Sequence, residues 1–153
     1  MNSTKNVAIP VNVKIEGTSE SPTKINLKAG KFSLTIDEPA NMGGTDEGPS
    51  PIQVLLMALA GCLNMTGHTV AKEQGLKLDE MKISIDGNMD AAHFMGYATS
   101  NRAGFEDVTV HIETKFDGVP NKEQRNKWLE ETERRCPVTD NMKSHTKISI
   151  NSN

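Results

Sequence analysis

The fold is organised around one segment in the first half of the chain, Gly48-Pro-Ser-Pro-Ile-Gln-Val-Leu-Leu-Met-Ala-Leu-Ala-Gly-Cys62. Ser50 can accept hydrogen bonds from the free amides at a helix start, and Pro51 suits the first helical position. Nearly every residue from there to Cys62 is apolar, and a helix that is apolar on all faces is expected to be buried all round. We predict one long helix from about Pro51 to Gln74, ended by Gly75.

Alternating apolar and polar residues on both sides of this helix predict β-strands. The short connection Ala29-Gly30 predicts a hairpin between the second and third strands. A further strand is conceivable in the Gly-, Met- and Asn-rich stretch from Asn88 to Gly104. The predicted strands are residues 11–15, 25–27, 32–36, Met81–Ile85, Val108–Phe116 and Thr146–Ile150.

Two shorter helices are predicted near the C-terminus. Asn121 and Gln124 have the spacing of a capping box, which predicts a helix over Lys122–Arg135. Pro137 interrupts it, and a short helix over Val138–Lys143 follows. The inner face of the first of these helices is predicted to carry Arg125, Trp128, Leu129 and Thr132. The order βββ-α-ββ-αα-β predicts a single α+β domain over residues 1–153, with antiparallel sheet and one central helix.

Composition narrows the classes of protein. With 153 residues, of which 35% are hydrophobic, the chain fits one domain with a thin core that a second subunit would complete. A net charge of −3 argues against nucleic-acid binding. The longest apolar run, Val54–Cys62, is half of what a bilayer span needs, and the first ten residues contain no secretory h-region. We therefore expect a soluble cytoplasmic protein without nucleic-acid or membrane partners.

Cys62 and Cys136 are the two cysteines of the chain. Either could be a small hydrophobic core residue, as buried thiols often are. Cys136, however, stands directly before a proline-led helix, whose amides would favour a thiolate. Two cysteines without others suggest a redox pair, one attacking and one resolving. Spacing alone leaves packing and redox chemistry open.

Other kinds of site have less support in the sequence. The chain has no GxSxG nucleophile elbow and no glycine-rich nucleotide motif. Zinc-type CxxC spacing is absent as well. We expect no metal site and no cofactor. We interpret the histidines as solvated or structural residues: His68, His93, His111 and His145.

Several segments, in this order and spacing, resemble the OsmC/Ohr family, in particular its GPSP-type branch. They are Leu34-Thr-Ile-Asp-Glu-Pro39, Gly43-Gly44, Gly48-Pro-Ser-Pro51 leading to Leu59-Ala-Gly-Cys62, and Cys136-Pro-Val138. The resemblance covers roughly Leu27 to Ile150. It implies an intertwined homodimer, in which antiparallel sheets wrap around long central helices and the active sites lie at the subunit interface.

The resemblance also implies the reduction of organic hydroperoxides in an oxidative stress response. Cys62 would attack the peroxide and become a sulfenic acid, and Cys136 would resolve it by closing a disulfide. An external dithiol, such as a lipoylated protein, would reopen the disulfide. Two alternatives stay open: a sulfur-carrier or small-molecule-binding protein without peroxidase activity, and a dimer in which both cysteines only pack.

The chain departs from the family where a positive charge should support the thiolate. Lys24 stands at the position of the family's arginine, and a lysine lacks the planar two-pronged contact of a guanidinium. Ile52 and Gln53 occupy the positions where the family has a glutamate to hold that arginine. We expect Glu47, or Gln53, to take over this supporting role. The other interpretation of Lys24 is a solvated strand lysine.

Overall fold

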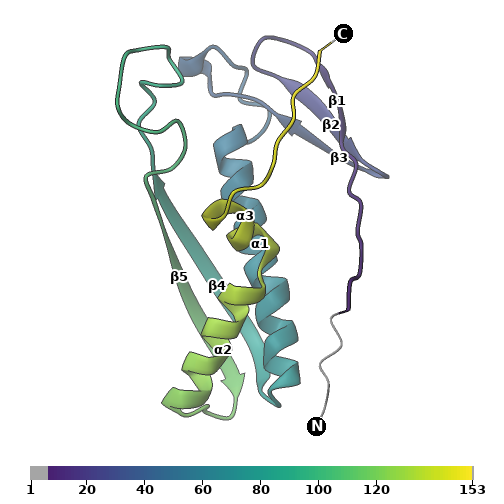
Figure 1. The fold of residues 1–153 in the computed structure, drawn as a ribbon, viewed down its shortest axis with the longest axis vertical. Coiled ribbons are helices and arrows are strands. Elements are labelled where there is room, and N and C mark those ends of the chain that lie inside the picture. Colours follow the sequence, from purple (N-terminus) through teal and green to yellow (C-terminus); the bar gives the residue numbers. More distant parts are fainter. Residues whose placement is uncertain (1–6, 153) are drawn as a thin grey trace. The chain divides into compact units, whose positions relative to one another are not determined.

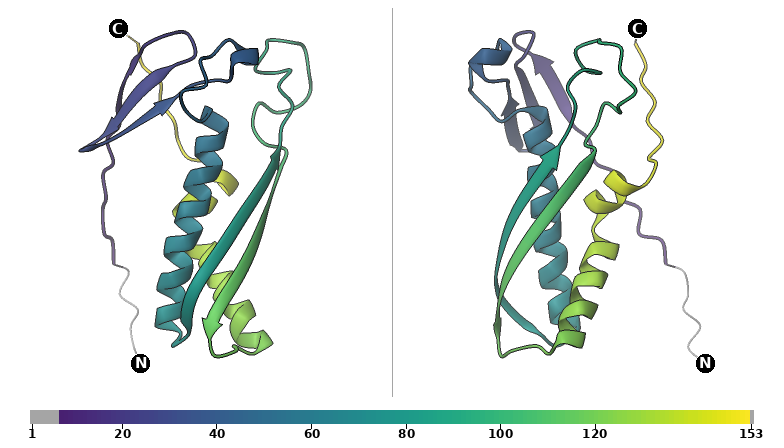
Figure 2. Two further views of the ribbon diagram at one scale, coloured as in Figure 1. Left: turned by 180° about the vertical axis from the view of Figure 1, so that it is seen from behind. Right: turned by 90° about the vertical axis from the view of Figure 1, so that its left-hand side faces the viewer.

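The computed structural model describes residues 7–152 and divides into two compact units on either side of the Val54–Leu55 bond (Figures 1 and 2). Antiparallel sheets and three α-helices confirm the predicted α+β class. The elements are β1 (Glu16–Ser19), β2 (Ile25–Ala29), β3 (Phe32–Ile36), the short 3₁₀ helix η1 (Ala40–Met42), α1 (Pro51–Glu73), β4 (Lys77–Asn88), β5 (Asp107–Asp117), α2 (Lys122–Arg135) and α3 (Pro137–Lys143).

The first unit contains a three-stranded antiparallel sheet in the order β1-β2-β3. The predicted hairpin is confirmed, because Ala29 pairs with Phe32 across a tight turn. The first strand, however, is Glu16–Ser19, and the prediction of a strand over residues 11–15 is wrong. An alternating pattern makes a segment suitable for a sheet, but a strand also needs a neighbour. On the β1 side of β2, pairing begins only at Glu16, so residues 11–15 have no partner there.

α1 begins at the predicted Pro51 and ends at Glu73, one residue before the predicted end. The backbone N–H of Gln53 donates to the Ser50 hydroxyl, while the Gln53 amide oxygen accepts from the Ser50 N–H at 2.8 Å, so the two residues form a capping box. At the other end Gly75 has a φ of +70°, a left-handed conformation that glycine adopts without strain.

The second unit is built on a long antiparallel pair, β4 and β5, which lies along α1 (Figure 2). Both strands extend beyond the predicted ranges, and a register shift interrupts the ladder between Leu78 and Glu80. Every second side chain of β5 is partly buried, as expected for a sheet with one solvated face. The connection between them, residues 89–106, contains no strand, so the strand considered over Asn88–Gly104 does not form.

α2 packs on α1 through Trp128, which shares a buried cluster with Val70 and Ala71. Trp128 is 2% exposed, its ring meets Phe116 edge-on at 5.7 Å, and the Thr132 side chain is fully buried. The predicted inner face is therefore correct for these two residues. Leu129 is 44% exposed, and Arg125 is exposed with its guanidinium above the Phe116 ring. The buried face of α2 is therefore narrower than predicted, since only Trp128 and Thr132 of the four predicted residues are buried.

The last predicted strand, Thr146–Ile150, is also absent. Residues 145–152 form no regular structure, and Ile148 and Ile150 are exposed. In the other unit, the apolar residues Val11 and Val13 before β1 are equally exposed. Each segment has the apolar alternation of a strand without a hydrogen-bonding neighbour in the part of the chain that the structure describes.

The first turns of α1 are not buried all round within a single chain, contrary to the expectation. Ile52, Leu55 and Met57 are exposed, and burial begins at Leu59. Among residues 7–152, α1 is the one helix long and apolar enough to cross a membrane, by length and composition only. The prediction that no segment spans a membrane was based on the continuous run Val54–Cys62 alone and not on the whole helix. The core helix of a soluble protein passes the same test.

Candidate functional site

The structure brings Cys62 and Cys136 together in one core cluster of the second unit, although 74 positions separate them. Cys62 is 9% exposed and Cys136 is fully buried, and both are free thiols. Leu59 and Leu63 complete the buried cluster. The partly buried residues around it come from β4, β5 and α3: Ile83, Ile85, Val108, Val110, Val138 and Met142.

Cys136 occupies a junction between two helices. It is the C-cap of α2 and the N-cap of α3, and the Thr139 backbone N–H donates to its sulfur at 3.5 Å. Pro137 suits the first position of α3, because proline has no N–H that would need an acceptor there and its fixed φ is that of a helix. The predicted placement of Cys136 at the start of a helix is confirmed.

The two thiols differ in their pKa. Burial raises the pKa of Cys62, and the hydrogen bond between this thiol and Cys136 raises it further. Burial also opposes ionisation of Cys136, but hydrogen bonds from Cys62, from the Thr139 hydroxyl and N–H and from the Val138 N–H outweigh it, so the pKa of Cys136 lies below the ordinary value. The surroundings of Cys136 therefore favour its thiolate, whereas those of Cys62 favour its thiol.

Thr66 is a further polar residue beside Cys62. Thr66 is buried and lies one helical turn beyond Cys62 on the same face of α1. A hydrogen bond from its hydroxyl acts to lower the pKa of Cys62, against the effect of burial. The sequence analysis missed this residue. Its spacing of four from a candidate nucleophile within a helix could have indicated it.

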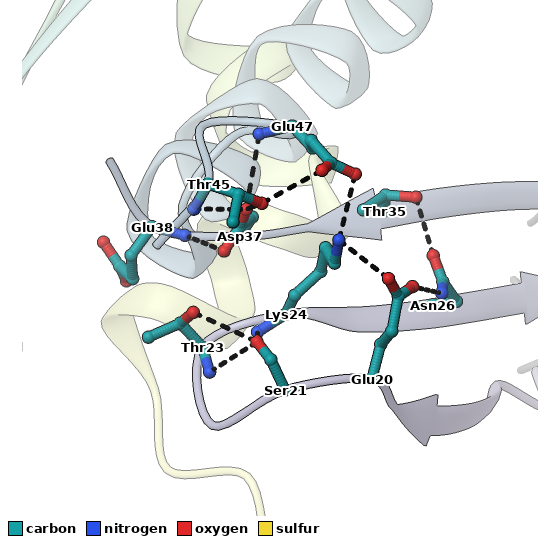
Figure 3. Close-up of polar contacts among 10 residues, drawn as sticks. All are labelled: Glu20, Ser21, Thr23, Lys24, Asn26, Thr35, Asp37, Glu38, Thr45 and Glu47. Carbon is teal, nitrogen blue, oxygen red and sulfur yellow. Dashed lines mark hydrogen bonds and ion pairs between the residues drawn. The ribbon is translucent and has the colours of Figure 1, made fainter. Parts of the chain in front are cut away.

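In the first unit, Lys24 is not a solvated strand lysine: the residue is 8% exposed and immediately precedes β2. Its ammonium forms ion pairs with Glu20 at 2.8 Å and with Glu47 at 3.0 Å (Figure 3). The hydrogen bonds to Glu20 and Glu47 hold the pKa of Lys24 well above its usual range. Glu47 thus contacts Lys24 as the sequence analysis suggested for a supporting carboxylate, whereas the Gln53 amide oxygen caps α1.

Asp37 organises the loop that carries Glu47. Its carboxylate is fully buried and accepts hydrogen bonds from the Thr45 hydroxyl at 2.6 Å and from the N–H groups of Glu38, Thr45 and Glu47 (Figure 3). The Thr45 hydroxyl and these amides hold the pKa of Asp37 well below its usual range. Gly44 permits the tight loop, because a Cβ there would stand 1.7 Å from the Glu38 carbonyl oxygen.

The sequence analysis did not single out Asp37. A carboxylate directly after a predicted strand, at the start of a loop with three glycines, is the signal that could have found it. Elsewhere in residues 7–152, no three His, Cys, Asp or Glu side chains gather as metal ligands would. The ring of His93 contacts the Asn101 carbonyl, and His111 and His145 are exposed.

Comparison with known proteins places this architecture in a family. The family model for OsmC-like protein matches residues 44–151, which include both cysteines. No curated protein sequence matches the chain significantly.

Solved structures with the same fold are distant in sequence. An OsmC-like protein from Mycoplasma pneumoniae superposes with a TM-score of 0.75 at 16% identity, over 88% of this chain and 89% of that one. An OsmC-like protein of unknown function from Vibrio cholerae gives 0.72 at 10% identity, over 86% and 94%. An organic hydroperoxide resistance protein OsmC from Legionella pneumophila gives 0.61 at 17% identity, over 88% and 91%. Because the family model covers well over half of the sequence, the chain belongs to the family of OsmC-like proteins.

Proposed function

We propose that this protein reduces organic hydroperoxides by cysteine chemistry, with Cys62 as the attacking and Cys136 as the resolving residue. One observation carries the proposal: the two cysteines of the chain share one buried cluster, in which the Thr139 N–H donates to the sulfur of Cys136. Two free thiols that pack only as small hydrophobic residues would have no need of the amides of Val138 and Thr139 around one of the sulfurs.

The pairing of the thiols suggests how the first step proceeds. Cys62 is the more exposed of the two residues, at 9% against 0% for Cys136, and we therefore assign the attack on the peroxide to Cys62. As its sulfur attacks the terminal oxygen of the hydroperoxide, its proton passes to the Cys136 thiolate. The O–O bond breaks, its electrons leave with the alkoxide, and the alkoxide takes the proton from Cys136 to become an alcohol. Cys62 is then a sulfenic acid and Cys136 is again a thiolate.

The second step closes the disulfide. The Cys136 thiolate attacks the Cys62 sulfur, and hydroxide leaves and is protonated by solvent to water. An external dithiol, such as a lipoylated protein, returns two electrons and restores both thiols. The apolar residues around Cys62, among them Leu59 and Leu63, favour a hydroperoxide with an organic group over a small polar one.

Relatives of similar structure support a role with peroxides. The proteins of this fold from Legionella pneumophila and Elizabethkingia anophelis are described as organic hydroperoxide resistance proteins. We extend that role to this chain because it belongs to the same family and retains a cysteine at both candidate positions.

We further propose a homodimer located in the cytoplasm. Ile52, Leu55 and Met57 on α1 are exposed apolar side chains, as are those of the segments before β1 and after α3. Exposed apolar side chains in such number are typical of a chain that associates with another. A second copy would bury it and would supply the strand neighbours that residues 11–15 and 146–150 lack.

The experiment is thiol counting after addition of cumene hydroperoxide. Wild type should lose two thiols per peroxide consumed, and Cys62→Ser should lose none. Cys136→Ser should lose one thiol and accumulate a sulfenic acid that dimedone traps. Equal thiol loss in Cys62→Ser and wild type would contradict the proposal. A stable persulfide on Cys136 after treatment with a sulfur donor, without peroxide consumption, would instead favour the sulfur carrier, for which the Thr139 N–H at the Cys136 sulfur is the supporting contact.

A further inference from the structure

The residue directly before Cys136 is tied to the helix that carries Cys62. Both terminal nitrogens of the Arg135 guanidinium donate to the two carboxylate oxygens of Glu73, the last residue of α1. The second of these contacts is 3.1 Å long. Arg135 also lies 4.0 Å from Glu131 on its own helix. A two-pronged contact of this kind fixes orientation as well as distance.

Glu73 lies on the same face of α1 as Cys62. Eleven residues separate them, and at about 100° per residue this amounts to three full turns with about 20° to spare. One face of α1 therefore contacts the end of α2 twice: at Glu73 through Arg135, and near Cys62 through Cys136. The ion pair joins the two chain segments that carry the thiols.

The position of Cys136 follows the end of α2 closely. The Cys136 N–H donates to the Glu133 carbonyl, and its own carbonyl accepts from the Asp140 N–H at 3.0 Å. Lys143, the last residue of α3, forms an ion pair with the Glu133 side chain of α2. These contacts tie Cys136 and α3 to the end of α2. A movement of that end would therefore carry Cys136 with it.

We infer that Arg135 and Glu73 are positioning residues that hold Cys136 against Cys62, speed closure of the disulfide and so protect Cys62 from overoxidation. This inference rests on the proposed function. A sulfenic acid has two fates: attack by the resolving thiol, or reaction with a second hydroperoxide, which gives up one oxygen and leaves as alcohol while the sulfenic acid becomes a sulfinic acid. The first fate depends on the effective concentration of Cys136 at Cys62, which a tether raises.

The test compares wild type with Arg135→Met, Glu73→Gln and Arg135→Lys. In the first two, we expect disulfide closure after cumene hydroperoxide to slow about threefold, the size of effect typical of partly exposed ion pairs. The sulfinic acid on Cys62, measured by mass spectrometry, should rise accordingly. Arg135→Lys keeps the charge without the fork and should fall in between.

A matched control separates positioning from a general loss of charge pairs. Lys77 and Asp117 form an exposed ion pair of 3.0 Å that joins β4 to β5 and includes no residue of α2 or α3. Lys77→Met should leave closure and overoxidation unchanged. Thermal unfolding of each variant checks that the fold is intact.

A second measurement does not use peroxide at all. The Cys62–Cys136 disulfide is equilibrated with glutathione buffers, where Arg135→Met and Glu73→Gln should lower the equilibrium constant for its formation about threefold. If wild type consumes peroxide through the disulfide but these variants match it in closure and in glutathione equilibrium, the inference is overturned and the proposed function stands. If peroxide forms no disulfide in wild type but the glutathione equilibrium shifts in the variants, the proposed function fails and the positioning role holds. No disulfide under either condition overturns both.

Discussion

The indole N–H of Trp128 donates a buried hydrogen bond of 2.8 Å to the backbone carbonyl of Gly67. This contact fixes α2 on α1 five residues beyond Cys62. Gly67 allows it, because a Cβ at this position would stand 2.8 Å from the Met81 sulfur and 3.2 Å from the Trp128 ring. A close approach of the α1 backbone to the Trp128 ring therefore holds the two helices together near the thiols.

Trp128→Phe removes this hydrogen bond and part of the buried ring. We expect the free energy of unfolding to fall by about 1–3 kcal/mol, since both a buried hydrogen bond and packing are lost. Urea denaturation measures the change. Leu129→Ala, on the neighbouring and half-exposed position, is the control and should cost less than Trp128→Phe. Equal costs would mean that the contact with Gly67 adds nothing.

The buried carboxylate of Asp37 should make stability depend on acid. Its pKa is depressed in the folded chain, so the unfolded chain binds the proton more readily. The contribution of Asp37 is therefore complete above the ordinary carboxyl pKa of about 4 and is lost as the pH falls below it. Asp37→Asn should remove this dependence and lower the melting temperature by about 5 °C or more at pH 7, because the amide cannot accept all four hydrogen bonds.

Thermal scans between pH 7 and pH 3 check this prediction. Glu38→Gln is the control, because Glu38 contributes its backbone N–H to the network and the substitution keeps it. The two variants should lose different amounts of stability at pH 7. If Asp37→Asn kept the acid dependence of wild type, another carboxyl group would be responsible for it.

Lys24 allows a test of whether the positive charge still supports the thiols in this chain. From the resemblance to the family, Lys24→Met is expected to raise the pKa at which Cys62 is alkylated and to slow peroxide reduction at pH 7. The pairing of Lys24 with Glu20 and Glu47 limits the size of this effect, because the carboxylates offset its charge. Lys24→Arg should match wild type if Glu47 accepts the guanidinium.

The measurement is the pH profile of Cys62 alkylation in the three proteins. Lys28→Met, on the exposed side of β2, is the control for loss of one lysine. A Lys24→Met profile identical to wild type would leave the lysine as a structural residue of its own unit.

The helices could be predicted from the sequence because their signals are local. Ser50 with Gln53, Asn121 with Gln124, and Gly75 each act within one turn of the helix end that they define. The meeting of Cys62 and Cys136 was expected from the family resemblance and is confirmed at the level of a shared cluster.

Features that depend on distant partners could not be predicted. The alternation in residues 11–15 and 146–150 indicates an apolar face, but it does not say which element would pair with these segments. We therefore predicted strands there, and the structure has none at these positions. The burial of Lys24 depends on Glu47, 23 residues away, and the burial of Asp37 on a loop that returns to it through Thr45. Neither is visible as a periodic pattern.

The exposed apolar side chains predict the oligomeric state. Sedimentation equilibrium at micromolar concentration should show a dimer, and Leu55→Glu, which places a charge on the exposed part of α1, should shift it toward monomer. Glu73→Gln, at the far end of α1, is the control and should sediment like wild type. A folded monomeric wild type would mean that these side chains are tolerated in water.

The last prediction concerns which sulfur carries the first negative charge. The absorbance of thiolate at 240 nm should rise in wild type below the ordinary thiol pKa of about 8.5, because the amides of Val138 and Thr139 stabilise the Cys136 anion. Cys136→Ser should lose this early step and leave a single step above the ordinary value, since burial raises the pKa of Cys62. Cys62→Ala removes the thiol that donates to Cys136, so the early step should persist but move to higher pH. If Cys136→Ser kept the early step, Cys62 would be the resting thiolate, and it would attack peroxide without first passing its proton to Cys136.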